Sequence, residues 1–183
     1  MTDEEIVHRV CGGETRMFEQ LVRRHQGAVY GMALRFTGNP TDAEDVAQEV
    51  FLTAFRGLVG YKEEAKFSTW LYRVAFNKCA DWLRKKGRRR AVSLDDAREI
   101  ADGRVDLEGG LVEETDRERV RRALDGLDER YRSVVVLLYY QRLSYEQIAE
   151  VLGVPVKTVE TRLYRARRML RERLGNRGEE VGV

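Results

Sequence analysis

Residues 157–177 hold eight Lys or Arg and only two acids, and these cations are the side chains best placed to do chemistry. Apolar residues recur in this segment at spacings of three and four, which predicts an α-helix with one core-facing side. The apolar positions are Val156, Val159, Leu163, Ala166 and Leu170. The opposite side carries Lys157, Thr161, Tyr164, Arg165 and Arg168. Lys and Arg neutralise phosphates, and Arg also pairs with guanine, so this side predicts DNA binding.

A shorter helix precedes this basic helix. Ser144 and Gln147 have the spacing of a capping box, Gly153 permits a tight turn, and Pro155 suits a helix start. Residues 143–170 therefore predict a helix-turn-helix. A basic helix alone is more often only the solvated side of a bundle. The capping box, the glycine turn and the one-sided basic stripe together favour DNA binding.

A second basic segment, residues 84–90, holds six cations in seven positions. A solvated helix end, stabilised by the helix dipole, explains this cluster as well as nucleic-acid binding does. Aromatic residues beside cations suit unpaired bases, and five of them lie upstream: Phe67, Trp70, Tyr72, Phe76 and Trp82. We expect Trp82 in the core, whereas for Phe67 and Tyr72 both interpretations stay open.

Helical signals position both basic segments. Thr41 and Glu44 predict a capping box, followed by an apolar face of Val46, Ala47, Val50, Phe51, Ala54, Phe55 and Leu58. Ser68 is expected to cap the next helix, which runs into the cation cluster. Asp128 is expected to cap a later helix. Residues 134–140 have strand propensity, but their capped surroundings favour a helix.

Composition indicates an all-α protein and excludes several classes. The chain has 183 residues, a net charge of +2, 35% charged residues and only two Pro, which favours long helices. His8 and His25 stand apart, Cys11 and Cys79 lack metal-site spacing, and no catalytic motif is visible. We expect no catalytic residue, metal or cofactor. The longest apolar run is far too short for membrane insertion, and the acidic N-terminus shows no leader pattern. We therefore expect a cytoplasmic protein.

Charge segregation divides the chain into two small helical domains. Residues 93–118 hold ten acids and three bases and include three Gly, which is typical of a flexible linker. We therefore place one domain at 1–92, an acidic linker at 93–115, a second domain at 116–174 and a tail at 175–183.

Four segments in order, residues 42–51, 67–73, 143–149 and 154–159, resemble signatures of the extracytoplasmic-function (ECF) sigma factors of bacterial RNA polymerase. The resemblance implies that the domains are sigma regions two and four. It implies core polymerase binding, with Asp45, Gln48 and Glu49 on the β′ clamp helices and region four on the β flap. It also implies promoter DNA and an anti-sigma factor as partners, and a stress or envelope-response regulon.

The resemblance also assigns the promoter contacts. Residues 61–84 match the element that reads the minus-ten motif and captures a flipped base. Its expected DNA contacts are Tyr61, Phe67, Tyr72, Arg73, Asn77 and Arg84. The helix-turn-helix matches the minus-thirty-five reader, with Lys157, Glu160, Thr161, Tyr164, Arg165 and Arg168 as contacts. Glu160 departs from the cation often found at its position.

Two other classes of protein also fit parts of the sequence. The first is a stand-alone helix-turn-helix regulator, although the N-terminal domain lacks the βα alternation of a ligand or receiver domain. The second is an RNA-binding or nucleoid protein, for which the four ordered signatures would be a coincidence.

Overall fold

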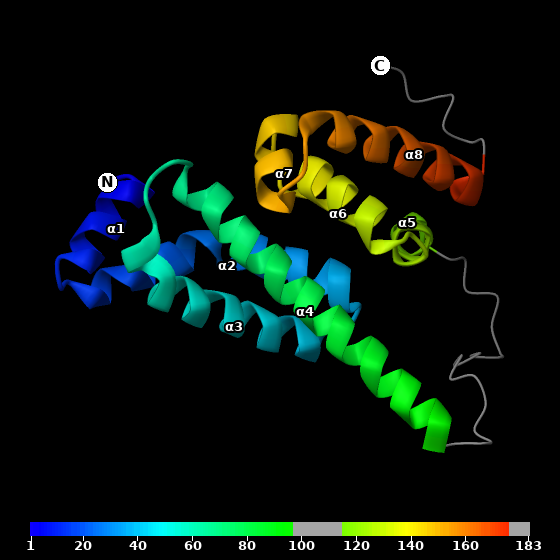
Figure 1. Ribbon diagram of the computed structural model, residues 1–183, viewed down its shortest axis with the longest axis horizontal. Coiled ribbons are helices and arrows are strands. Elements are labelled where there is room, and N and C mark those ends of the chain that lie inside the picture. The colour runs from blue at the N-terminus through cyan, green and yellow to red at the C-terminus, as the bar shows by residue number, and fades with distance from the viewer. Residues whose placement is uncertain (97–114, 176–183) are drawn as a thin grey trace.

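A computed structural model describes residues 1–96 and 115–175 of the chain, with the side chains of residues 1–87 and 115–175. These residues form helices joined by short turns, with no strand among them, so the predicted all-α class is confirmed (Figure 1). The first domain contains α1 (Asp3–Cys11), η1 (Thr15–Met17), α2 (Phe18–Thr37), α3 (Pro40–Gly57), η2 (Leu58–Gly60) and α4 (Phe67–Asp96). The second contains α5 (Asp116–Asp125), α6 (Glu129–Val135), η3 (Val136–Tyr140), α7 (Tyr145–Leu152) and α8 (Val156–Leu174).

Helices α2, α3 and α4 pack on one another, and α1 covers one end of them. Asp3 holds α1 in place, because its carboxylate accepts hydrogen bonds from Arg24 at 2.7 Å and from His25 at 2.6 Å. Burial alone would raise the pKa of Asp3, but the hydrogen bonds from Arg24 and His25 outweigh it and lower that pKa. The ion pairs therefore stabilise the packing of α1 on α2.

The start of α3 differs from the prediction. Asn39, not Thr41, is the N-cap, and its side chain accepts a hydrogen bond from the backbone N–H of Asp42 at 3.1 Å. Pro40 takes the first helical position, where a missing N–H costs nothing and its fixed φ suits a helix. The predicted Thr41–Glu44 capping box is therefore wrong by two residues.

The start and end of α4 also differ from the prediction. The helix begins at Phe67, so Ser68 lies inside its first turn rather than capping it. Glu4 of α1 supplies an acceptor instead, at 3.1 Å from the backbone N of Phe67. The helix continues to Asp96, four residues into the predicted linker. Residues 97–114 of that linker, and the tail beyond residue 175, lie outside the described residues.

Local signals in the second domain are confirmed. Asp128 caps α6, and Ser144 and Gln147 form the predicted capping box of α7. Residues 136–140 are helical, as a π-helical continuation of α6, which resolves their strand propensity in favour of a helix. Gly153 takes a left-handed conformation (φ +64°) between α7 and α8, which completes the helix-turn-helix.

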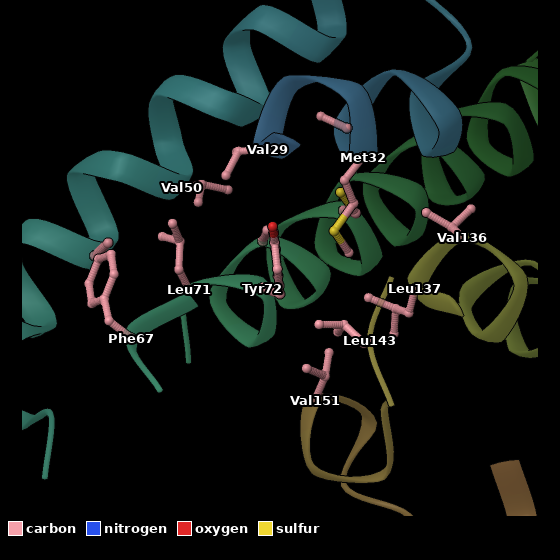
Figure 2. Packing of buried hydrophobic residues seen from close by; sticks show 14 of the residues in the cluster. Val29, Met32, Val50, Phe67, Leu71, Tyr72, Val136, Leu137, Leu143 and Val151 are labelled. Atoms are coloured by element: carbon pink, nitrogen blue, oxygen red, sulfur yellow. The ribbon is translucent and has the colours of Figure 1, made fainter. Parts of the chain in front are cut away.

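The two domains lie against each other. Helix α4 contacts α7, and α2 contacts both α5 and η3. One hydrophobic cluster contains buried residues of both domains, and in it Met32 and Tyr72 of the first domain join Leu137, Leu143 and Val151 of the second (Figure 2). The domains are therefore held together by side-chain packing as well as by the chain that joins them.

Candidate nucleic-acid interface

The outer side of α8 carries the six side chains predicted to contact the upstream promoter element. Val159, Leu163 and Ala166 are buried on its inner side, as the periodicity predicts. Lys157, Glu160, Thr161, Tyr164, Arg165 and Arg168 are all exposed, and Tyr164 has 70% of its surface accessible. Lys157 pairs with Glu160 at 3.3 Å, and Arg168 pairs with Glu172 at 3.6 Å. The helix therefore presents a mixed, mainly cationic surface to a partner.

A small cleft of about 260 Å³ lies between α8 and the start of α6. Four cations line it, Arg130, Lys157, Arg162 and Arg165, and none of the described residues that line it is acidic. Sequence reasoning missed Arg130 and Arg162. Arg162 adjoins the exposed stripe at Thr161 and could have been included from helical spacing. Arg130 comes from another helix, so only the folded chain brings it beside Arg165.

Four of the six predicted minus-ten contacts are at least partly accessible. Arg73, Asn77 and Arg84 are exposed on α4, and Arg84 pairs with Asp81. Tyr61 is half-buried in the loop before α4, and its hydroxyl donates a hydrogen bond to the carbonyl of Ala65 at 2.6 Å. Burial, with smaller contributions from the charges of Glu4 and Glu63, raises the pKa of Tyr61 to about 12. Tyr61 is therefore a neutral phenol at physiological pH.

The other two predicted contacts, Phe67 and Tyr72, are buried. Phe67 has no accessible surface and makes edge-on ring contacts with His25 and Tyr61, at centroid distances of 5.6 and 6.0 Å. A ring with no free side cannot stack on a base, so its assignment as a DNA contact is corrected to a core position. Tyr72 is 8% exposed in the cluster shared by the domains. In this arrangement it is not open to DNA either.

Trp82 was expected in the core, and it lies partly buried against the cluster. The ammonium of Lys86 lies 4.4 Å from the centroid of its ring, which is a cation–π contact. The cation cluster thus begins on a solvated part of α4, where Arg84, Lys85 and Lys86 are exposed.

The predicted polymerase contacts Asp45, Gln48 and Glu49 are exposed on α3, away from its buried residues Ala43, Val46, Val50 and Ala54. They lie on two different sides of the helix. Asp45 and Glu49 line a groove of about 410 Å³ shared with α4, and Gln48 lines a groove shared with α2. Lys78 of α4 donates a hydrogen bond to Glu49 at 3.1 Å, and this bond lowers the pKa of the Glu49 carboxyl.

The groove between α2 and α3 is apolar and has a volume of about 680 Å³. Phe18, Val22, Phe51, Leu52 and Phe55 line it beside Gln48. Leu52 and Phe55 are 55% and 40% exposed, so the expectation that Phe55 belongs to the core-facing side is wrong. Adjacent exposed apolar side chains on a surface with a polar rim indicate a protein-binding site. The signal in the sequence was Leu52, an apolar residue outside the predicted stripe.

Within residues 1–96 and 115–175, no group of three or more His, Cys, Asp or Glu is arranged to hold a metal ion. None of the helices in these ranges is both long and apolar enough to cross a membrane.

The fold and its exposed helix surfaces define a two-domain helical initiation factor of the sigma-70 type. Residues 21–89 match the family described as Sigma-70 region 2, and residues 117–170 match Sigma-70, region 4. The chain belongs to the extracytoplasmic-function sigma factors. It is therefore a non-catalytic RNA polymerase sigma factor that directs promoter-specific transcription initiation, rather than a stand-alone regulator or an RNA-binding or nucleoid protein.

Relatives match over nearly the whole chain. The RNA polymerase sigma-H factor of Pseudomonas aeruginosa is 36% identical over 174 residues, which is 90% of each chain. The ECF RNA polymerase sigma-E factor of Escherichia coli is 35% identical over 175 residues, 91% of each chain. The ECF RNA polymerase sigma factor SigW of Bacillus subtilis is 34% identical and covers 92% of this chain and 94% of its own.

Two solved structures share the fold. CnrH, in complex with the cytosolic domain of CnrY, is 32% identical with a TM-score of 0.72, covering 96% of this chain and 99% of its own. The sigma factor RpoE of Bartonella quintana, in complex with the anti-sigma factor NepR, has a TM-score of 0.69 at 24% identity, covering 86% and 96%.

Proposed function

We propose that this sigma factor docks on core RNA polymerase through α3 and reads two promoter elements, one with α8 and one with α4. The observation that carries the proposal is the exposed cationic side of α8 within a helix-turn-helix, in a chain whose other domain presents exposed polar residues on α3 and α4. The experiment below tests it as a complete initiation reaction.

For the upstream element, we assign base contacts to Glu160, Thr161, Tyr164 and Arg165 at the centre of the exposed side of α8. Arg can form a bidentate pair with guanine, and Glu can accept a hydrogen bond from cytosine. Lys157 and Arg168, nearer the two ends of the contact, are assigned to phosphates. The cleft beside Arg165 adds Arg130 and Arg162 as phosphate contacts, because a concentration of cations there favours the DNA backbone.

For the minus-ten element, we assign contacts to Tyr61, Arg73, Asn77 and Arg84. Asn77 offers an amide that can pair with a base edge, and the arginines supply phosphate contacts. Extruding a base costs a few kcal/mol, which these contacts must recover. Tyr72 and Phe67 are both buried, so neither is assigned a contact, and Phe67 supports the loop from the core.

For core polymerase, Asp45, Gln48 and Glu49 supply the polar contacts with the β′ clamp helices, and the apolar groove beside Gln48 supplies buried area. The β flap is the proposed partner of the second domain. RpoE is bound by the anti-sigma factor NepR, and CnrH is bound by the cytosolic domain of CnrY, which supports an anti-sigma factor for this chain as well. Partners of this kind support action in the cytoplasm, and we propose a stress or envelope-response regulon.

The test is transcription reconstituted from the purified chain, core polymerase and a promoter library randomised in two blocks. Selection is expected to enrich two separated sequence motifs, and only when chain and polymerase are both present. The isolated chain is expected to bind the enriched promoters weakly, because each domain offers a small contact area. Tight binding of both elements without polymerase, or no enrichment with polymerase, would overturn the proposal.

A further inference from the structure

Helix α1 contacts the segment that precedes the proposed minus-ten reader. Residues 61–66, called the minus-ten loop below, join η2 to α4 and begin with Tyr61, which is assigned to DNA. Helix α1 contacts both η2 and α4, and Figure 1 shows it beside the segment that joins them. None of the residues assigned to DNA or to polymerase belongs to α1, so its contacts have no role in the function proposed above.

Glu4 of α1 supplies an acceptor that the start of α4 lacks. The carbonyl of Lys66 accepts the hydrogen bond from the backbone N of Trp70, which places Lys66 at the N-cap position. A lysine side chain only donates hydrogen bonds, so it cannot cap a helix. The Glu4 carboxylate accepts from the backbone N–H of Phe67 instead, at 3.1 Å. Because a helix N-terminus carries a partial positive charge, a carboxylate there is stabilising. The first residue of α4 is therefore held from α1.

His8 of α1 contacts the middle of the minus-ten loop. Its Nε2 atom lies 2.7 Å from the Glu63 carboxylate. Glu63 has a φ of +57°, in the left-handed region that residues other than glycine rarely adopt. A strained conformation of this kind persists only where the surrounding contacts hold it. The contact with His8 is one of these, and the hydrogen bond from the Tyr61 hydroxyl to the Ala65 carbonyl is another.

The two contacts act on the loop from one side of α1. Glu4 and His8 are four residues apart, so they lie one helical turn apart on the same side of the helix. The ion pairs of Asp3 attach α1 to α2, so α1 is itself a fixed support. The ring of Phe67 packs edge-on against Tyr61, and a shift of the Phe67 backbone therefore also changes the support of the Tyr61 ring.

We propose that α1 positions the minus-ten loop, with Glu4 and His8 as positioning residues that fix Tyr61 and the start of α4 for base reading. The inference rests on the minus-ten function proposed for the loop and α4. A loop held in one conformation binds the matching base without first being ordered, whereas a loosened loop accepts more than one base. Glu4 and His8 therefore affect which base is preferred, although neither is assigned a contact with DNA.

Paired substitutions at each position separate the loss of a contact from any other effect of the change. Glu4→Ala removes the acceptor for the Phe67 N–H, whereas Glu4→Gln keeps an oxygen that accepts this bond. His8→Ala removes the contact with Glu63, whereas His8→Gln keeps an amide N–H that donates to a carboxylate. Rescue by the glutamine variants is expected if the hydrogen bonds themselves position the loop.

Amide hydrogen exchange of the free chain tests the hold of α1 on the loop. Residues 61–70 are expected to exchange about tenfold faster in Glu4→Ala, because the Phe67 N–H loses its acceptor and the first turn of α4 frays. His8→Ala is expected to accelerate exchange in residues 61–66 only, since Glu4 stays in place. Glu4→Gln is expected to exchange nearly as slowly as wild type. Unchanged exchange in both alanine variants would overturn the inference.

Glu14→Ala is the matched control. It removes an exposed ion pair of 2.7 Å between Arg9 of α1 and the residue before η1, and it leaves Glu4 and His8 in place. Both the exchange of the minus-ten loop and the promoter preference are expected to stay at their wild-type values. An effect on the loop as large as that of Glu4→Ala would mean that any weakening of α1 loosens it, and would overturn the roles of Glu4 and His8.

Base preference is measured as holoenzyme, on promoters varied one position at a time through both elements. Glu4→Ala is expected to reduce the preference at one minus-ten position about fivefold and to leave the upstream preference unchanged. The ratio of initiation rates on two promoters does not depend on how much of the chain is folded, so a loss of stability alone leaves it unchanged. Glu4→Gln is expected to restore most of the preference.

Tyr61→Ala and Asn77→Ala separate failure of the inference from failure of the proposed function. Both residues are assigned minus-ten contacts, so both substitutions are expected to relax preference there. If they do so while Glu4→Ala and His8→Ala do not, α1 is not a positioning element, and the function proposed for α4 stands. If neither changes the minus-ten preference, the function proposed for the loop and α4 is contradicted, and the inference that rests on it fails with it.

Discussion

An ion pair between Lys78 and Glu49 links α4, the helix assigned to promoter DNA, with α3, the helix assigned to polymerase. The ammonium of Lys78 on α4 lies 3.1 Å from the Glu49 carboxylate on α3, and both face the groove that Asp45 also lines. Glu49 is assigned to polymerase, and α4 is assigned to promoter DNA. A polymerase cation that bound Glu49 would therefore compete with Lys78 of α4 for the same carboxylate.

Glu49→Gln and Lys78→Met test which partner Glu49 serves. Both substitutions break the same exposed ion pair, which contributes less than about 1 kcal/mol to the free energy of unfolding. The melting temperature is therefore expected to fall by less than about 4 °C in each. Only Glu49→Gln is expected to weaken association with core polymerase, on the order of tenfold by fluorescence anisotropy.

Asp45→Ala and Gln48→Ala are the companion variants. Both residues are exposed and off the buried stripe of α3, so each substitution is expected to change stability by less than about 0.5 kcal/mol while weakening association. Equal weakening by Lys78→Met and Glu49→Gln would mean that the ion pair, rather than a direct contact of Glu49, supports docking. Unfolding of the alanine variants would contradict their assignment to polymerase.

Leu52→Asp tests the apolar groove beside Gln48. Leu52 is exposed, so a charge there has little effect on folding but opposes burial against a partner. Association with core polymerase is expected to weaken by about tenfold or more, with the melting temperature nearly unchanged. Val59→Asp, at an exposed valine in η2 outside the groove, is the matched control. Equal effects of the two substitutions on association would argue against a docking groove.

Local patterns predicted the helix-turn-helix well. The stripe of Val159, Leu163 and Ala166 is buried as expected, and Asp128 and Ser144 cap their helices. These features depend on residues within a few positions of one another, where helical geometry alone determines the outcome. The N-cap predicted at Thr41 is wrong, because Pro40 suits the first helical position and Asn39 is therefore the N-cap.

Contacts between distant segments could not be predicted from the sequence. The acceptor for the Phe67 backbone is Glu4, on another helix, and the burial of the Phe67 ring follows from packing against His25 and Tyr61. The hydrogen bond from Gln147 to Thr69 joins two segments that are far apart in the sequence, and neither segment carries a local signal for the other. Periodicity identifies which side of a helix is apolar, but not which other helix covers it.

Asp3→Asn tests the attachment of α1 and its pH dependence. The pKa of Asp3 lies below its ordinary value of 3.8 in the folded chain, so the ionised carboxylate stabilises the fold. This stabilisation is present above the unfolded pKa and is lost as pH falls through the folded pKa. The substitution is expected to lower the free energy of unfolding by about 1 kcal/mol at pH 7.

Urea titrations of wild type and Asp3→Asn at pH 7, 5 and 3 measure this difference. It is expected to be largest at pH 7 and 5 and to shrink at pH 3, where the unfolded carboxyl is mostly protonated. Glu14→Gln, which removes the exposed ion pair of Arg9, is the control and is expected to have a smaller effect at pH 7. A difference that grows toward low pH would contradict the assigned pKa direction.

Arg165→Ala and Arg168→Ala separate base reading from phosphate binding on α8. Arg165 lies in the cationic cleft near the centre of the exposed side, so its loss is expected to cost about 1–3 kcal/mol on the preferred sequence and to relax discrimination at one base pair. Arg168 lies nearly one turn farther along and is paired with Glu172. Its loss is expected to weaken all sequences alike and to reduce the salt slope by about one.

Both variants are to be measured as holoenzyme, on promoters varied through the upstream element and at several salt concentrations. Arg130→Ala and Arg162→Ala extend the same test to the cleft, and both are expected to behave like Arg168→Ala, because the cations of the cleft are assigned to phosphates. If Arg165→Ala weakens every promoter equally while Arg168→Ala changes the preferred base, the two roles are reversed. If Arg130→Ala alters base preference, the cleft binds a base edge rather than the backbone. If none of the four variants changes binding, α8 is not the reader of the upstream element.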